Sequence, residues 1–152
     1  MQTIASFLVN HDVLTKGIYV SRIDGDITTY DLRMRLPNRE EPMQTGALHS
    51  LEHLVATVVR NGALSDRVIY FGPMGCRTGC YLLLRDCEPQ TAIDLIRDAV
   101  KCAAEWDAPL PGAEARECGN CADHDLEGAK REAALYYEVI RNWKPEDLTY
   151  PG

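Results

Sequence analysis

A stripe of apolar residues between positions 46 and 61 is the feature that most constrains the fold of this chain. Apolar side chains occur at positions 48, 51, 54, 55, 58 and 59, which is the spacing of one face of an α-helix. The pattern stops near Asn61 and Gly62, residues of the kind that follow the end of a helix. A helix with one apolar face packs that face on another layer of the domain, so the remaining elements have to supply the layer.

Alternating patterns on both sides of this helix predict that layer. The predicted strands are residues 17–24, 28–37, 67–76 and 80–87. Further helices are predicted at residues 89–106 and 123–143, with a loop at 109–121 between them. We therefore expect a single domain over residues 1–152 with an α+β fold, a two-layer sandwich in which helices pack on one face of an antiparallel sheet.

Length and charge narrow the classes of function. The chain has 152 residues, with 23 acidic and 16 basic side chains and a net charge of -7. No Lys/Arg-rich block is present, so we expect neither nucleic acid nor an anionic membrane as a partner. No segment reaches the roughly 18 apolar residues of a membrane span, and no signal peptide is visible. These features favour a cytoplasmic location and six reduced cysteines rather than disulfides.

The predicted helix at 46–61 carries the strongest chemical motif. His49 and His53 are four residues apart and lie on one helical face, which suits a shared divalent metal. Glu52 precedes the second histidine, so its carboxylate can approach the open side of that metal, as in the H-x-x-E-H pattern of inverted zincins. The alternative is two partly exposed histidines beside a solvated glutamate.

A C-x-x-C motif lies in the loop before the last helix. Cys118 and Cys121 are followed closely by Asp123 and His124. The pair can be a redox couple, half of a four-cysteine zinc site, or one metal ligand with a bystander. Because an open catalytic metal site uses three protein ligands, one thiolate from this loop would complete the histidine pair. Two ordinary loop thiols remain the alternative.

A third candidate is Cys76, which lies between Gly75 and Gly79 where the third predicted strand meets the loop to the fourth. Glycines let the backbone turn sharply or approach a ligand closely. A thiol displayed there beside a metal can carry protons, because the metal would favour its thiolate form. A buried structural cysteine in a turn is an equally good interpretation of this segment alone.

Several segments, taken together and in order, resemble the S-ribosylhomocysteine lyase family, the bacterial autoinducer-2 synthases. The segments are Ser6-Phe7 with His11, then YDLRMRLPN, HSLEHL, GPMGCRTGCYL and CGNCADHDLEGAK. The resemblance covers about residues 6–143, and the combination is far more specific than any single motif. The chain departs from the common family pattern at Asn10 and Ser50 and has the extra thiols Cys80 and Cys121.

The resemblance implies a homodimer with its two active sites at the subunit interface, and one divalent metal per subunit. That metal is Fe²⁺ natively, with Zn²⁺ or Co²⁺ as possible replacements. The implied site residues are His49, His53 and Cys118 as metal ligands, Glu52 and Cys76 as the acid–base pair, and Ser6, His11 and Arg33 as substrate-binding residues. A guanidinium suits the carboxylate of an amino-acid-bearing substrate.

The implied reaction converts S-ribosylhomocysteine to homocysteine and 4,5-dihydroxy-2,3-pentanedione, a step of the methyl cycle and of quorum-sensing signal synthesis. Two carbonyl shifts along the sugar precede a β-elimination, with proton transfers assigned to Cys76 and Glu52. Two other functions use the same residues. One is an inverted-zincin metallopeptidase, and the other is a non-catalytic zinc-stabilised module in which Cys121 supplies a fourth ligand.

Overall fold

The computed structural model describes residues 1–152 and contains one four-stranded antiparallel sheet with the strand order β1-β2-β4-β3. The strands are β1 (Gly17–Asp24), β2 (Ile27–Arg33), β3 (Val68–Pro73) and β4 (Gly79–Arg85). The helices are α1 (Ala5–Leu8), α2 (Thr45–Arg60), α3 (Pro89–Ala104) and α4 (Leu126–Ile140). The predicted α+β fold with an antiparallel sheet is confirmed.

Strand alternation gives the sheet one apolar face and one polar face. Tyr30 and Leu32 of β2 belong to the main hydrophobic core, whereas Asp31 and Arg33 point to the other face, as the two-residue period requires. On β4 the core residues are Cys80, Leu82 and Leu84. Burial raises the pKa of the Cys80 thiol far above its usual range, so this extra cysteine is a protonated core residue.

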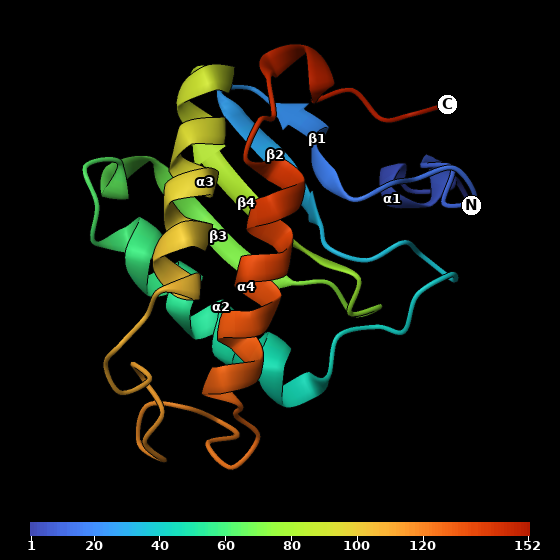
Figure 1. Cartoon of the computed structure of the whole chain (residues 1–152). Helices are drawn as coiled ribbons and strands as arrows, with labels where there is room; N and C mark the ends of the chain where they lie inside the picture. The colour runs from blue at the N-terminus through green and yellow to red at the C-terminus, as the bar shows by residue number, and fades with distance from the viewer.

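The three long helices cover the apolar face of the sheet. Helices α3 and α4 run side by side across the strands, and α2 packs against both of them and against β3 (Figure 1). Their apolar stripes share one core with the strands, in which Leu54 of α2, Ile96 of α3 and Ile140 of α4 are almost fully buried. Burial of these stripes, more than helix propensity, stabilises the helices.

Several predicted boundaries are wrong, and three of these errors concern residues near the candidate site. Strand β3 ends at Pro73 rather than at residue 76, so Cys76 lies on the loop that follows it. Strand β2 ends at Arg33 rather than at residue 37, because the next two backbone N–H groups, of Met34 and Arg35, both donate to the Thr78 carbonyl instead of continuing the ladder. The last helix begins at Leu126 rather than at residue 123. Its N-cap is Asp125, whose carboxylate accepts a hydrogen bond from the Gly128 N–H at 2.9 Å.

The structure also contains three short helical segments that the sequence patterns did not predict. Helix α1 is a single turn beside the sheet, and 3₁₀ turns occur at Ser65–Arg67 and Pro145–Asp147. Both termini lie on the same side of the molecule (Figure 1). None of the helices has the length and apolar character needed to cross a membrane.

Candidate metal centre and adjoining cavity

The two histidines of the H-x-x-E-H motif are fixed by backbone carbonyls from a distant loop. The Nδ1 of His49 lies 2.8 Å from the Asp123 carbonyl oxygen, and the Nδ1 of His53 lies 2.9 Å from the Pro111 carbonyl oxygen. A carbonyl oxygen can only accept, so each Nδ1 carries the hydrogen and each Nε2 presents a lone pair. Both rings are therefore in the tautomer that a metal ligand requires.

The loop that supplies one of these carbonyls depends on a glycine. Gly112 follows Pro111 and has a φ of 68°, in the left-handed region that favours glycine. A Cβ at this position would lie 3.2 Å from the Nδ1 of His53. The absence of a side chain lets the loop approach the histidine ring closely enough for the Pro111 carbonyl to accept its hydrogen.

Four side chains bring nitrogen and sulfur atoms to one point beside α2. The ligand atoms of His49, His53, Cys118 and His124 all lie within 4.8 Å of one another. The Cys118 Sγ is 3.4 Å from the His49 Nε2, close to the separation of roughly 3.6 Å expected for sulfur and nitrogen ligands in a tetrahedral site. This cluster can bind one metal ion, and its imidazole and thiolate donors suit zinc or iron. Cys121 is not part of the cluster and is exposed.

His124 is a neutral imidazole in this environment. Burial lowers the pKa of its ring below the usual value, and the neighbouring His49 and His53 lower it further. The C-x-x-C motif places His124 three residues after Cys121 but predicts no role for it. Its position one residue before the N-cap of α4 explains how it reaches the cluster: the residues predicted as the first turn of a helix are a loop that packs on α2.

A cavity of about 400 Å³ brings together the predicted substrate-binding residues and one of the two predicted proton carriers. Ser6, His11, Arg33 and Cys76 all line it. A smaller cavity of about 240 Å³ is lined by His49 and Glu52. The two cavities share residues 73–75 as a wall, so the loop between β3 and β4 separates the metal cluster from the predicted substrate-binding residues.

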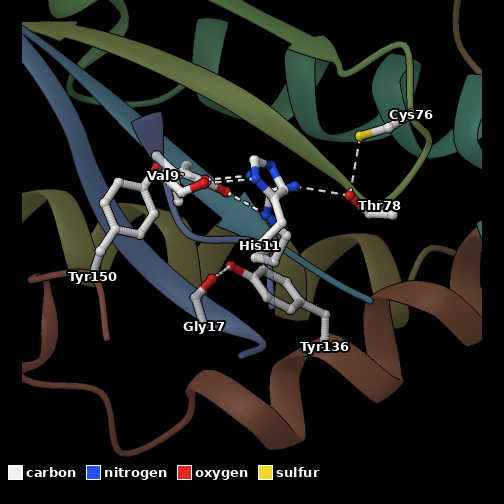
Figure 2. Close-up of polar contacts among 9 residues, drawn as sticks. Val9, His11, Gly17, Cys76, Thr78, Tyr136 and Tyr150 are labelled. Carbon is white, nitrogen blue, oxygen red and sulfur yellow. Dashed lines mark hydrogen bonds and ion pairs between the residues drawn. The ribbon is translucent and has the colours of Figure 1, made fainter. Parts of the chain in front are cut away.

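The Cys76 thiol is the end of a chain of polar contacts that begins in a buried ion pair. Arg33 donates to both carboxylate oxygens of Asp31, at 2.6 and 3.1 Å, and these two side chains are at most 3% exposed. Burial acts to lower the pKa of Arg33, but the Asp31 carboxylate outweighs it, so the pKa is raised and the guanidinium stays charged. Arg33 also donates to the Thr78 hydroxyl at 2.8 Å. That hydroxyl lies 3.1 Å from the Cys76 sulfur, the contact drawn between Thr78 and Cys76 in Figure 2.

The Thr78 hydroxyl can support a deprotonated sulfur at Cys76. The Thr78 oxygen accepts from Arg33, which has no acceptor atom, so the Thr78 hydrogen is free to point at the Cys76 sulfur. A thiolate at Cys76 would receive this hydrogen bond, whereas a Cys76 thiol could donate to the second lone pair of the Thr78 oxygen. This arrangement suits a group that takes a proton from a substrate.

The C-terminal segment of the protein contacts this network, and the N-terminal segment lines the same cavity. The Tyr150 hydroxyl donates to Asp31 at 2.6 Å, and burial together with the Asp31 charge raises the pKa of Tyr150, so the phenol keeps its proton. His11 contacts the Val9 carbonyl oxygen through its Nδ1 at 2.8 Å, which leaves its Nε2 available. Both residues are labelled in Figure 2. The sequence patterns give no role to Asp31, Thr78 or Tyr150. Thr78 and Tyr150 contact the ion pair from positions 45 and 119 residues away along the sequence.

Comparison with known proteins identifies the family of this chain. The sequence model of the S-ribosylhomocysteinase (LuxS) family matches residues 4–147. The chain belongs to this family. A curated S-ribosylhomocysteine lyase from Finegoldia magna is 47% identical, over 99% of this chain and 99% of its own length. One from Phocaeicola vulgatus is 44% identical, over 99% of this chain and 98% of its own length. A relative of the same name from Clostridium acetobutylicum is 45% identical over 99% of both chains.

Membership of the S-ribosylhomocysteinase family does not favour either alternative function. The metallopeptidase shares only the H-x-x-E-H motif with this chain. The zinc-stabilised module needs Cys121 as a fourth ligand, whereas the fourth member of the cluster is His124.

In this S-ribosylhomocysteinase family member, we expect Asp31→Asn to lower the free energy of unfolding by about 3–5 kcal/mol, because it leaves the Arg33 charge buried without its partner. The matched control is Asp24→Asn, which removes the carboxylate of the exposed Arg22–Asp24 pair and should leave stability nearly unchanged. Urea denaturation of both variants measures the difference. Equal stability of the two variants would contradict a structural role for the buried pair.

Proposed function

We propose that this chain cleaves S-ribosylhomocysteine to homocysteine and 4,5-dihydroxy-2,3-pentanedione. The observation that carries the proposal is that a metal-binding cluster and a hydrogen-bonded thiol lie on the two sides of one short loop, in a member of the S-ribosylhomocysteinase family. Two shifts move the sugar carbonyl along the chain, and a β-elimination then breaks the carbon–sulfur bond. The atoms of the two products add up to those of the substrate, so the reaction needs no oxidant or reductant.

We assign one divalent metal per subunit to His49, His53 and Cys118, with Fe²⁺ as the native ion and Zn²⁺ or Co²⁺ as replacements. Two neutral imidazoles and a thiolate leave one coordination position open, as in catalytic metal sites. The bound ion would act as a Lewis acid that acidifies the C–H bonds next to the sugar carbonyl.

Cys76 and Glu52 are our proposed proton carriers. The Cys76 sulfur lies 3.1 Å from the Thr78 hydroxyl, which can donate to its thiolate form, and it is exposed on the loop between β3 and β4. Glu52 lies on α2 between the two histidine ligands and faces the smaller cavity. Because the two cavities share a wall, a substrate lying across residues 73–75 presents neighbouring carbons to both groups.

Ser6, His11 and Arg33 are our proposed substrate-binding residues. All three line the larger cavity together with Cys76. Arg33 uses three N–H groups on Asp31 and Thr78, and its remaining donors suit the polar groups of an amino-acid substrate. The buried ion pair holds this guanidinium in place before substrate binds.

We also propose that residues 1–152 form one metal-dependent lyase domain and that the protein is a homodimer with its active sites at the subunit interface. The N-terminal segment supports this assembly, because Ile4, Phe7 and Leu8 are exposed apolar residues beside the larger cavity. A second subunit that covers them would also enclose the substrate. The cytoplasmic location stays a prediction.

The ligand assignment predicts that His49→Ala, His53→Ala and Cys118→Ala each abolish tight metal binding, because two protein ligands hold a divalent ion only weakly. Cys121→Ala is the matched control and should retain one metal per chain, because its thiol lies outside the cluster. Metal content after dialysis measures both. A Cys121→Ala protein without metal, with metal retained in Cys118→Ala, would reverse the assignment.

The acid–base assignment predicts that the unmodified protein releases homocysteine from S-ribosylhomocysteine and that Cys76→Ala or Glu52→Gln slows release by about 10²–10⁴-fold while metal content is kept. Cys76→Asp keeps an ionisable group, so it should exchange more substrate hydrogen with solvent deuterium than Cys76→Ala does. A thiol assay and NMR provide the two measurements. Near-normal turnover in both of the first two variants would refute the proposed chemistry.

The dimer predicts that sites are shared between chains. A Ser6→Ala/His11→Ala double variant and a Cys118→Ala variant should each be inactive alone. If Ser6 and His11 act on the partner's metal site, mixing the two variants under conditions of subunit exchange should restore part of the activity in hybrid dimers. Exchange demonstrated by native mass spectrometry, without any recovery of activity, would show that each site uses residues of one chain.

A further inference from the structure

His124 is the one member of the metal-binding cluster without a role in the proposed function. Its Nε2 lies 3.6 Å from the Cys118 Sγ. That distance fits two ligands of one tetrahedral ion, and it also fits an N–H group that donates to sulfur. The orientation of the rings and the hydrogen bonds around His124 distinguish the two roles.

The ring orientations separate His124 from the other two histidines. The rings of His49 and His53 have centroids 4.8 Å apart and are nearly perpendicular, with an interplanar angle of 88°. The rings of His49 and His124 are stacked, with centroids 3.9 Å apart and an interplanar angle of 23°. Imidazole lone pairs lie in the ring plane. Two nearly parallel, stacked rings therefore point their lone pairs along neighbouring lines and not at one ion about 2 Å away.

The hydrogen bonds around Ser50 fix the tautomer of His124. Ser50 is fully buried on α2, and its Oγ accepts the Asp125 backbone N–H at 2.9 Å. The Ser50 Oγ also lies 3.0 Å from the His124 Nδ1. A buried hydroxyl hydrogen needs an acceptor, and this nitrogen is the acceptor that the structure provides. The Nδ1 of His124 therefore holds the lone pair, and its Nε2 carries the hydrogen.

This tautomer is the reverse of the one in the two histidine ligands. In His49 and His53 the Nδ1–H donates a hydrogen bond to a backbone carbonyl, and the Nε2 has a free lone pair. In His124 the Nε2–H points at the Cys118 sulfur. The tautomers differ because the partners of Nδ1 differ. Loop carbonyls accept hydrogen bonds from His49 and His53, whereas the Ser50 hydroxyl of α2 donates one to His124.

We propose that His124 is a positioning residue that donates its Nε2–H to the Cys118 thiolate and does not bind the metal, with Ser50 holding its tautomer. This inference rests on Cys118 being a ligand, as in the proposed function. The N–H···S bond withdraws charge from the thiolate, so the sulfur neutralises less of the charge of the ion. It also holds Cys118 against α2 while the fourth coordination position stays open.

The test uses Co²⁺-loaded protein, because a thiolate ligand gives a sulfur-to-cobalt charge-transfer band and the d–d bands report the ligand number. In His124→Leu we expect the charge-transfer band to move to longer wavelength, because loss of the hydrogen bond raises the energy of the sulfur lone pair. We expect the d–d bands to keep their four-coordinate intensity and the cobalt affinity to fall by about 10–100-fold. His124→Gln can place an amide N–H near the Nε2 position and should return the band toward its original wavelength.

Two further variants sharpen the comparison. Ser50→Ala frees the His124 tautomer and should shift the band in the same direction as His124→Leu, by a smaller amount. Cys121→Ala is the control for a thiol change near the loop and should leave the spectrum unchanged. A merely structural role of His124 would change protein stability without moving the band.

The possible failures are distinguishable. A charge-transfer band that His124→Leu leaves in place refutes the inference. So does an equal change of the d–d bands in His124→Leu and His124→Gln, because a lost ligand affects both variants alike. Absence of the charge-transfer band from the unmodified protein refutes Cys118 as a ligand, and with it the proposed metal site. The homocysteine assay on unmodified protein tests the proposed reaction separately.

Discussion

Helix α2 and the loop before α4 are held together by hydrogen bonds between side chains of the helix and backbone groups of the loop, and the metal-binding cluster depends on them. His49 donates to the Asp123 carbonyl, and the Asp125 N–H donates to Ser50. Close packing at Gly46 allows this approach, since a Cβ there would lie 3.3 Å from the Asp123 carboxylate and 3.4 Å from the His124 backbone. The loop carries Cys118 and His124 to the helix only while these contacts hold.

The sequence predicts the parts of the site that depend on local periodicity. The apolar stripe places His49 and His53 on one face of a helix, and the structure has that helix at Thr45–Arg60. The orientation of the two rings was not predictable in the same way, because their Nδ1 partners lie 74 and 58 residues further along the chain. Motif spacing gives the candidate ligands, and the path of a distant loop gives their tautomers.

The far face of the sheet shows a different limit of sequence patterns. Alternation correctly places Asp31 and Arg33 on the face opposite the helices, which would normally be exposed to solvent. Both residues are buried, and Tyr150 from the C-terminal segment contacts Asp31. A pattern with a period of two residues says which side chains share a face. It does not say that the ends of the chain will cover that face.

The wall formed by residues 73–75 has a consequence for the discovery of inhibitors. Each cavity beside it is small, at about 240 and 400 Å³, and the two differ in chemistry, with imidazole and carboxylate groups on one side and a guanidinium and a thiol on the other. Separate fragments would bind each cavity weakly. A short linker across the wall would join the two fragments, so that binding of the second fragment becomes intramolecular. The high effective concentration of the second fragment would then raise the affinity without any new contact.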